Sequence, residues 1–186
     1  MKSELHLMQI NVVGGGVAGL ATARAAAMRG AKVCVFEQAR EIREVGAGLQ
    51  LSPNGMRVID ALGLGAELRD TSLEGRGVVL RNQSGKQVLR MDLTNVDGTF
   101  LMAHRADLIA ALSHDFQSLG IDLNLNIRIE AGSARPTEPT LTVAADGARS
   151  GLRAALCGDA APFFTGQVAW RAIIDAHPDE PAEAQV

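Results

Sequence analysis

The start of the chain shows two short apolar runs on either side of a segment with helical composition. The run Gln9–Val13 is rich in β-branched residues and predicts a buried strand. Val17–Arg29 is rich in Ala and Leu and predicts a helix that ends at Gly30. A second strand is expected at Lys32–Glu37. Strand, helix and strand in this order form a βαβ unit, so we expect the two strands to be parallel.

The rest of the pattern predicts a mixed α/β chain. Helices are expected at 51–62, 105–119 and 151–156, and strands at 78–81, 87–91, 121–129, 141–145 and 166–174. Ser52 and Pro53 are typical of a helix start, and Gly63 and Gly65 are expected to end that helix. The strands at 78–81 and 87–91 flank a turn and predict a hairpin. Residues 177–186 are rich in Pro and acidic residues and predict a disordered or unfinished tail.

Composition narrows the class of protein. The 186 residues are 47% hydrophobic and 21% charged, as is ordinary for a globular domain, and the net charge of −3 gives no reason to expect nucleic acid or an anionic membrane. Every apolar run is interrupted, so we expect neither a signal peptide nor a membrane span. Two cysteines, Cys34 and Cys157, exclude a disulfide framework and favour a reduced, cytoplasmic setting.

The glycines between the first strand and the first helix carry the main chemical signal. Gly14-x-Gly16-x-x-Gly19 has the spacing of a dinucleotide-binding turn, in which the first glycine permits the turn, the second admits a pyrophosphate and the third lets helix and strand pack closely. The helix N-terminus then faces the phosphates. Glu37, at the end of the second strand, is placed to accept hydrogen bonds from ribose hydroxyls. The alternative interpretation is a strand–turn–helix whose glycines serve only tight packing, with no nucleotide bound. The motif by itself does not distinguish a site for NAD from a site for FAD.

Four longer stretches add a family resemblance. They are VVGGGVAGLATARAAAMRGAKVCVFEQA, EVGAGLQLSPNGMRVIDALGL, HRADLIAAL, and VAADGARSGLR followed by FTGQVAWRAII. In this order they resemble the single-component FAD-dependent aromatic hydroxylases, the family of p-hydroxybenzoate hydroxylase and salicylate hydroxylase. The resemblance implies a Rossmann-like FAD-binding domain over residues 1–160, with a central parallel sheet, helices and a small β layer. A substrate-domain sheet would begin in residues 161–186. The chain would then stop about halfway through a full-length member, as a truncated protein or one from which segments were removed.

The same resemblance assigns cofactor contacts residue by residue. The implied FAD-binding residues are Gly14, Gly16, Val17, Ala18, Gly19, Glu37, Gln38, Gly48, Leu49, Arg105 and Asp146. The glycines and helix amides would hold the pyrophosphate, Glu37 the adenosine ribose, and the segment with Gly48 the flavin and ribityl chain. Arg105 would lie near the ribityl–pyrophosphate junction, where a guanidinium makes charge-assisted hydrogen bonds. Asp146 begins an Asp-Gly turn credited with a role toward both FAD and the nicotinamide donor.

The implied reaction is hydroxylation of an aromatic acid or phenol. NADH or NADPH would reduce the flavin, and O₂ would form a flavin C4a-hydroperoxide that transfers oxygen to the ring. No catalytic base is visible, because Ala47 stands where some relatives place a histidine and the chain has no Tyr. The four His do not have the spacing of metal ligands, so no metal is expected. A nicotinamide-dependent dehydrogenase and a non-catalytic FAD-binding fragment stay open as alternatives, and so does a homodimer.

Overall fold

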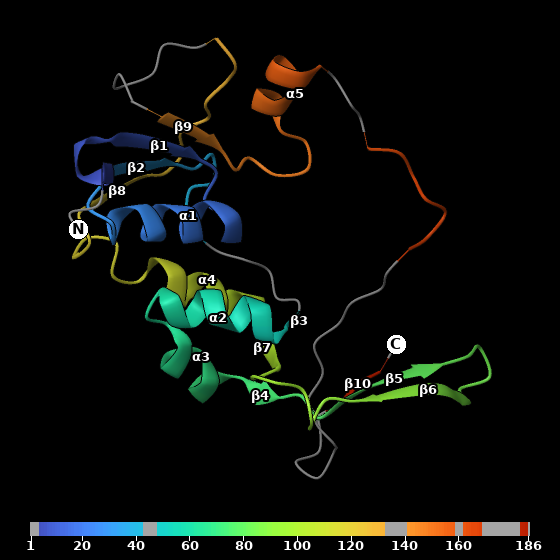
Figure 1. Cartoon of the computed structure of the whole chain (residues 1–186). Coiled ribbons are helices and arrows are strands. Elements are labelled where there is room, and N and C mark those ends of the chain that lie inside the picture. Colours follow the sequence, from blue (N-terminus) through green and yellow to red (C-terminus); the bar gives the residue numbers. More distant parts are fainter. Residues whose placement is uncertain (1–3, 43–47, 133–140, 159–161, 169–182, 186) are drawn as a thin grey trace. The chain divides into compact units, whose positions relative to one another are not determined.

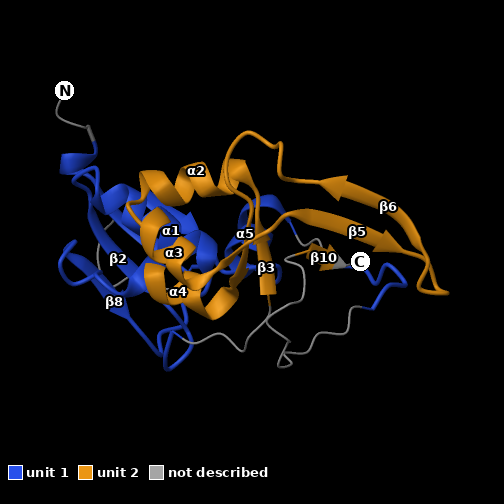
Figure 2. Ribbon diagram, turned by 90° about the horizontal axis from the view of Figure 1, so that it is seen from below, with its two compact units in different colours: residues 1–44, 112–169 blue, residues 45–111, 170–186 orange. Residues whose placement is uncertain are grey.

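A computed structural model describes residues 4–42, 48–132, 141–158, 162–168 and 183–185 (Figure 1). These residues fall into two compact units. The first unit comprises residues 1–44 and 112–169, and the second comprises residues 45–111 and 170–186 (Figure 2). The expected boundary between residues 160 and 161 lies outside the described residues and stays a prediction.

The first unit contains a four-stranded parallel sheet. Its elements are the 3₁₀ helix η1 (Glu4–Leu7), β1 (Gln9–Val13), α1 (Val17–Ala27), β2 (Lys32–Phe36), β8 (Ile121–Asn124), β9 (Leu141–Ala144) and α5 (Gly151–Cys157). The strand order is β8-β2-β1-β9, and each neighbouring pair is parallel. Renumbered along the chain, this is the order 3-2-1-4 of a dinucleotide-binding sheet. The predicted α/β class and the parallel βαβ unit are confirmed.

Burial of the two central strands explains their composition. Val12 on β1 and Val35 on β2 are register partners, and both are fully buried. Leu20 and Ala23 on α1 are also fully buried, and this helix packs on β1 and β2. A strand that is covered on both faces needs apolar residues throughout rather than alternation, which is the pattern of the sequence.

The second unit combines short helices with two small sheets. Its elements are β3 (Gly48–Leu51), α2 (Pro53–Ala61), α3 (Gly65–Thr71), β4 (Leu73–Glu74), β5 (Gly77–Arg81), β6 (Gln87–Asp92), β7 (Leu101–His104) and β10 (Glu183–Gln185). The helix α4 (Arg105–Ser113) begins in this unit and ends in the first. One sheet has the order β3-β7-β4 and the other β10-β5-β6. The predicted hairpin is confirmed as the antiparallel pair β5–β6.

Several predicted elements are one or two residues longer than the observed ones, and two are longer by five residues or more. The helix expected to reach residue 119 ends at Ser113, and turns follow it, although Phe116 keeps the apolar period and is buried. The strand expected to reach residue 129 ends at Asn124, because Asn126 adopts a positive φ of 56° and its N–H donates to the Ala39 carbonyl. In both places apolar spacing continues beyond the regular backbone, since burial does not require one continuous element.

Other predictions, made for residues 51–65 and for the C-terminal segment, were wrong in part. The helix expected from residue 51 begins at Pro53, because Leu51 is the last residue of β3. Gly63, with φ of 77°, does end that helix region, but Gly65 begins α3 instead of acting as a stop. The tail is not wholly irregular, since Glu183–Gln185 forms β10. Residues 166–168 are not a strand, and the rest of the strand expected there lies outside the described residues.

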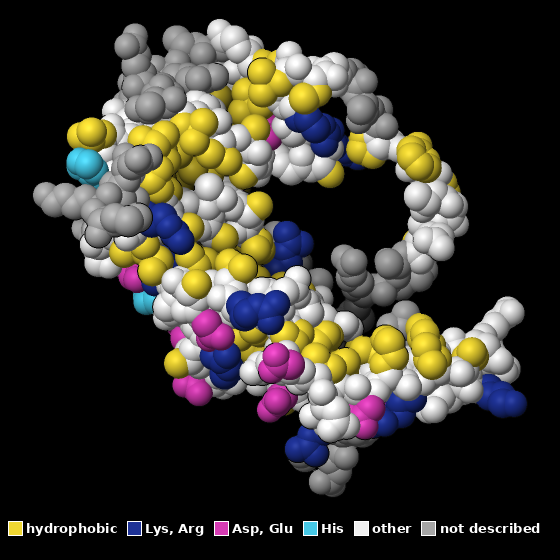
Figure 3. Space-filling model, in the orientation of Figure 1, with side chains coloured by type: hydrophobic (Ala, Val, Ile, Leu, Met, Phe, Trp, Pro, Cys, Tyr) yellow, Lys and Arg dark blue, Asp and Glu magenta, His cyan; other side chains and the backbone are white. Residues whose placement is uncertain are grey.

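The β10-β5-β6 sheet has one apolar face. Register partners and alternate residues along a strand share a face, which places five apolar residues together: Val78, Leu80, Leu89, Met91 and Ala184. Leu89 and Met91 are nearly half exposed. Hydrophobic side chains are accordingly visible over the hairpin in Figure 3. The opposite face carries Arg90, Asp92 and Glu183 together with Val79, which is 1% exposed.

Candidate functional site

A cleft of about 620 Å³ opens at the carboxyl ends of the parallel strands in the first unit. The turns after β1, β2 and β9 line it, together with the segment after β8; the lining residues are Val13, Gly14, Gly16, Phe36, Glu37, Gln38, 127–131, 145–147, Arg149 and Gly151. β1 lies between β2, which follows it along the chain, and β9, which comes much later. This is a change of winding direction, and ligands of open α/β sheets bind at such a position.

The first and third glycines of the turn are required by packing. Gly14 has φ of 111°, and a Cβ on it would lie 2.2 Å from the Ala145 carbonyl oxygen. A Cβ on Gly19 would lie 1.9 Å from the Gly14 carbonyl oxygen. Neither position can hold a side chain without moving backbone, so both glycines serve the close approach of β1, α1 and the turn after β9.

Gly16 differs from its neighbours in the turn. Apart from its chain neighbours Gly15 and Val17, no residue has an atom within 4 Å of the position of a Cβ on Gly16, and its φ of −81° is one that other residues adopt. It lines the cleft and is the N-cap of α1, where no side chain caps the helix. Packing therefore does not explain this glycine. The open space lies beside free N–H groups at a helix start, which is an arrangement suited to an anion.

Glu37 connects the glycine turn to the neighbouring strands. Its carboxylate accepts hydrogen bonds from the N–H groups of Gly15 (2.5 Å) and Ala39 (2.8 Å). Its own backbone N–H donates to Asn124, and its carbonyl accepts from Ile127. The side chain also lines the cleft. Because each carboxylate oxygen can accept more than one hydrogen bond, Glu37 is held in position and keeps capacity for a hydroxyl donor.

Asp146 has a buried oxygen that lacks a partner among the described residues. Its Oδ2 accepts a long hydrogen bond of 3.4 Å from the Leu152 N–H, whereas Oδ1 is buried and unsatisfied. Gly147, with φ of 83°, makes the turn, and Ser150 caps α5 by accepting from the Arg153 N–H at 2.9 Å. A buried carboxylate oxygen at the edge of a cleft favours a hydrogen-bond donor from a ligand or from water.

The cleft carries charges of both signs. Arg128 pairs with Glu130 at 3.5 Å, and both side chains are 73% exposed. Arg149 is exposed, lines the cleft beside Gly147 and has no ion pair with another described residue. Sequence reasoning missed Arg128 and Arg149 as lining residues. The signal for Arg149 was its position three residues after Asp146, in a turn already assigned to the site.

The structure brings together only part of the predicted set. Gly14, Gly16, Glu37, Gln38 and Asp146 line the cleft, and Val17, Ala18 and Gly19 form the first turn of α1. Gly48, Leu49 and Arg105 belong to the second unit, which is described by itself, and Gly46 and Ala47 lie outside the described residues. The roles of these residues stay predictions.

Within the second unit, pairing of β3 with β7 relates two of the predicted positions. Gly48 lies opposite His104, and Leu49 lies opposite Ala103. Arg105 follows His104 directly and begins α4. Sequence positions more than 50 residues apart are thereby placed at one end of the same strand pair.

The described residues contain no group of three or more His, Cys, Asp or Glu side chains that could hold a metal ion. None of the helices among them is long and apolar enough to span a membrane.

Comparison with known proteins decides the family. The family model described as "FAD binding domain" matches residues 8–181, which is almost the whole chain. The chain belongs to the FAD binding domain family. The expected family is therefore confirmed. The match to an FAD binding domain counts against the alternative of a dehydrogenase that uses only a nicotinamide cofactor.

Similar proteins include monooxygenases and hydroxylases. The chain is 35% identical to the FAD-dependent monooxygenase OpS4 of Beauveria bassiana, with 94% of this chain and 45% of that protein covered. It is 30% identical to 3-hydroxybenzoate 6-hydroxylase of Klebsiella oxytoca, with 91% and 47% covered. A solved tetrameric form of 2-methyl-3-hydroxypyridine-5-carboxylic acid oxygenase matches with a TM-score of 0.71 and 28% identity, covering 81% of this chain and 42% of that one. The chain thus spans about half the length of the relatives it matches.

Proposed function

We propose that the first unit of this FAD binding domain holds the ADP part of FAD in the cleft at the ends of β1, β2 and β9. The pyrophosphate would lie against Gly16 and the first turn of α1, and the adenosine ribose against Glu37. The observation that carries the proposal is the open space at Gly16, where no residue other than the two chain neighbours has an atom within 4 Å of a Cβ position. The crowded glycines on either side show that such space is not a general property of the turn.

The residues present fit this group. The N-cap of α1 has free N–H groups and no side-chain cap for an anion to displace. Glu37 lines the cleft and is held by two backbone N–H groups, one on each carboxylate oxygen. Asp146 has a buried oxygen without a partner among the described residues, which suits a hydroxyl or water near the cofactor. Arg149 supplies a cation near two carboxylates that would otherwise repel a diphosphate.

We infer that the protein to which this chain corresponds is a monooxygenase of a small aromatic acid or phenol, with NADH or NADPH as the transient donor. Support comes from the names of similar proteins, including 3-hydroxybenzoate 6-hydroxylase and 6-hydroxynicotinate 3-monooxygenase. The flavin supplies the redox and oxygen chemistry when bound. The residues of this chain bind its adenosine diphosphate half and fix its orientation.

The test is a binding titration of the chain with four ligands. Binding of FAD and FMN is followed by quenching of flavin fluorescence, binding of NADH by its own fluorescence, and ADP is added as a competitor. We expect FAD to bind, ADP to displace it and FMN, which lacks the AMP part of FAD and keeps a single phosphate, to bind much more weakly. Equal binding of FMN and FAD, or failure of ADP to compete, would overturn the assignment of the cleft. Binding of NADH with no binding of FAD would favour a nicotinamide enzyme.

A matched pair of variants tests the observation on which the proposal rests, the open space at Gly16. Gly16→Ala adds one methyl group where no protein atom is close and where φ is permissive, so the fold is expected to be unchanged. The methyl would occupy space proposed for the pyrophosphate, and we expect FAD affinity to fall about tenfold or more. Gly55→Ala, in α2, also has room and is the control. Normal FAD affinity in Gly16→Ala would contradict the proposed site.

A further inference from the structure

The strand β10 has only a short backbone pairing with the β5–β6 hairpin. It has three residues, Glu183–Gln185, and runs parallel to β5 with Glu183 opposite Gly77 and Ala184 opposite Val78. Three residues are at the lower limit of strand length, and parallel pairing is slightly less stable per residue than antiparallel pairing. Side-chain interactions must therefore contribute to the position of β10.

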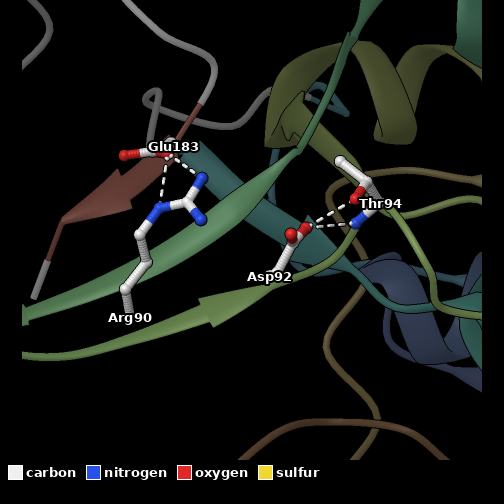
Figure 4. Close-up of polar contacts among 4 residues, drawn as sticks. All are labelled: Arg90, Asp92, Thr94 and Glu183. Carbon is white, nitrogen blue, oxygen red and sulfur yellow. Dashed lines mark hydrogen bonds and ion pairs between the residues drawn. The ribbon is translucent and has the colours of Figure 1, made fainter.

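The main such interaction passes across the central strand of the sheet. Arg90, on β6, donates from Nε (3.1 Å) and Nη2 (2.7 Å) to Oε1 of Glu183 on β10 (Figure 4). β5 lies between these two strands, and the contact crosses it at Gly77. A Cβ on Gly77 would lie 3.3 Å from Glu183 Oε1 and 3.5 Å from Arg90 Nη2. A glycine at this position leaves the room that the ion pair uses.

This ion pair also bears on register. Glu183 lies on the face with Arg90, Asp92 and the buried Val79, while Ala184 lies on the face with Val78, Leu80, Leu89 and Met91. A slip of one residue would move Glu183 to the face that lacks Arg90 and Ala184 to the face that has it. The pairing of Glu183 with Arg90 thus distinguishes the observed register from its neighbours.

Arg90 has a second carboxylate within reach. Asp92 lies two residues further along β6, on the same face and opposite Gly77. Its carboxylate accepts hydrogen bonds from the Thr94 hydroxyl (2.6 Å) and the Thr94 N–H (2.9 Å) (Figure 4). These bonds, and to a smaller extent the charge of Arg90, hold the pKa of Asp92 below its usual range. Asp92 is therefore charged at neutral pH and turned toward Thr94.

We propose that Thr94 selects the partner of Arg90. By holding the Asp92 carboxylate through the loop that follows β6, Thr94 leaves the guanidinium to Glu183, and β10 stays in register on β5. Without the Thr94 hydroxyl, Asp92 competes for Arg90, and the Arg90–Glu183 pair is weakened. Two carboxylates on one face of the sheet, those of Asp92 and Glu183, thus compete for the guanidinium of Arg90. This proposal does not depend on the cofactor assignment.

Amide hydrogen exchange of the full chain, followed by NMR, tests the proposal. The amides of residues 183–185 report β10, and those of the β3–β7 pair are an internal reference in the same unit. For an exposed ion pair we expect Glu183→Gln to lower protection of β10 about two- to fivefold. Thr94→Val is expected to lower it by a smaller factor, and Thr94→Ser, which keeps the hydroxyl, is expected to have no effect. The reference amides are expected to be unchanged in all three.

Two double variants separate selection from general support of the loop. Asp92→Asn removes the competing charge, so adding it to Thr94→Val is expected to restore the protection of β10. In the Glu183→Gln background, Thr94→Val is expected to have no further effect, because no ion pair is left to weaken. Failure of Asp92→Asn to restore protection would overturn the proposal. An equal effect of Thr94→Val with and without Glu183 would also overturn it.

Discussion

The carbonyl oxygen of Gly14 lies 1.9 Å from the position that a Cβ on Gly19 would occupy. The first turn of α1 therefore rests directly on the backbone of the turn that precedes it. This contact places the N-terminus of α1 at the cleft, and it explains why Gly19 is needed although it does not line the cleft itself.

The two outer glycines of the turn are expected to affect stability, in contrast to Gly16. Gly19→Ala must displace backbone, and overpacking of this kind costs about 1–3 kcal/mol of the free energy of unfolding. Thermal unfolding measured by circular dichroism is expected to show a clear loss of Tm for Gly19→Ala and none for Gly16→Ala. Equal Tm values for the two variants would contradict the packing role of Gly19.

Glu37→Gln is expected to weaken binding of the adenosine diphosphate half. Two backbone N–H groups donate to the carboxylate, and an amide NH₂ in place of one oxygen would face a donor. Loss of charge-assisted hydrogen bonds of this kind corresponds to about tenfold or more in affinity. The measurement is ADP binding by calorimetry. Glu74→Gln, at an exposed position of β4, is the control, and equal ADP affinity in both variants would count against the role of Glu37.

Reversal of charge at Arg149 is expected to discriminate between ligands. Arg149→Glu adds a carboxylate to a cleft that already contains Glu37, Glu130 and Asp146, so ADP and FAD are expected to bind severalfold more weakly, while adenosine, which has no phosphate, is unaffected. The loss is expected to shrink at high salt. Arg57→Glu, on α2, is the control. An equal loss for adenosine and ADP would show that Arg149 does not act on the phosphates.

The buried pair of Arg24 on α1 and Asp115 is expected to contribute to stability in a pH-dependent way. Both terminal nitrogens of Arg24, Nη1 and Nη2, donate to the carboxylate of Asp115. The Arg24 side chain is 8% exposed and the Asp115 side chain 27%. The hydrogen bonds from Arg24, followed by its charge, lower the pKa of Asp115. A lowered pKa in the folded state gives stability that is present above about pH 4, the unfolded value, and is lost as pH falls through the folded pKa.

Asp115→Asn is therefore expected to cost about 1–3 kcal/mol of the free energy of unfolding at pH 7. The difference from the unchanged chain is expected to narrow below about pH 4, as the native carboxylate is protonated. Urea denaturation at pH 7 and pH 3 measures both values. A difference that is equal at the two pH values would contradict the ion-pair account.

The two cysteines are expected to differ in reactivity. Burial, and then the negative charge of Asp122, raises the pKa of the Cys34 thiol on β2, and its side chain is 5% exposed. Cys157, at the end of α5, is exposed. Because the thiolate is the reactive form, iodoacetamide is expected to label Cys157 in the native chain and Cys34 only after unfolding. Mass spectrometry of the labelled peptides gives the result, and rapid native labelling of Cys34 would contradict its burial.

Local sequence was sufficient for the βαβ unit, because each of its signals acts within a few residues. The apolar run of β1, the alanine-rich α1 and the stop at Gly30 each have a short-range cause, and β1 was predicted to the residue. The glycine spacing and Glu37 could be found in the same way. The short elements β3, α3, β4 and β7 were missed, since they have little periodicity of their own and exist through pairing and burial in the second unit.

The sequence by itself determined that a glycine-rich turn joins β1 to α1, that β1 and β2 are parallel neighbours and that β5 and β6 form a hairpin, because the signals for each of these features lie close together along the chain. Only the tertiary structure distinguished Gly16, whose space is open, from its crowded neighbours. Only the tertiary structure placed Asp146 and Arg149 beside Glu37, and Glu183 across β5 from Arg90. The physical reason is that these relations join residues far apart along the chain, and their distances depend on how strands pair rather than on local preference.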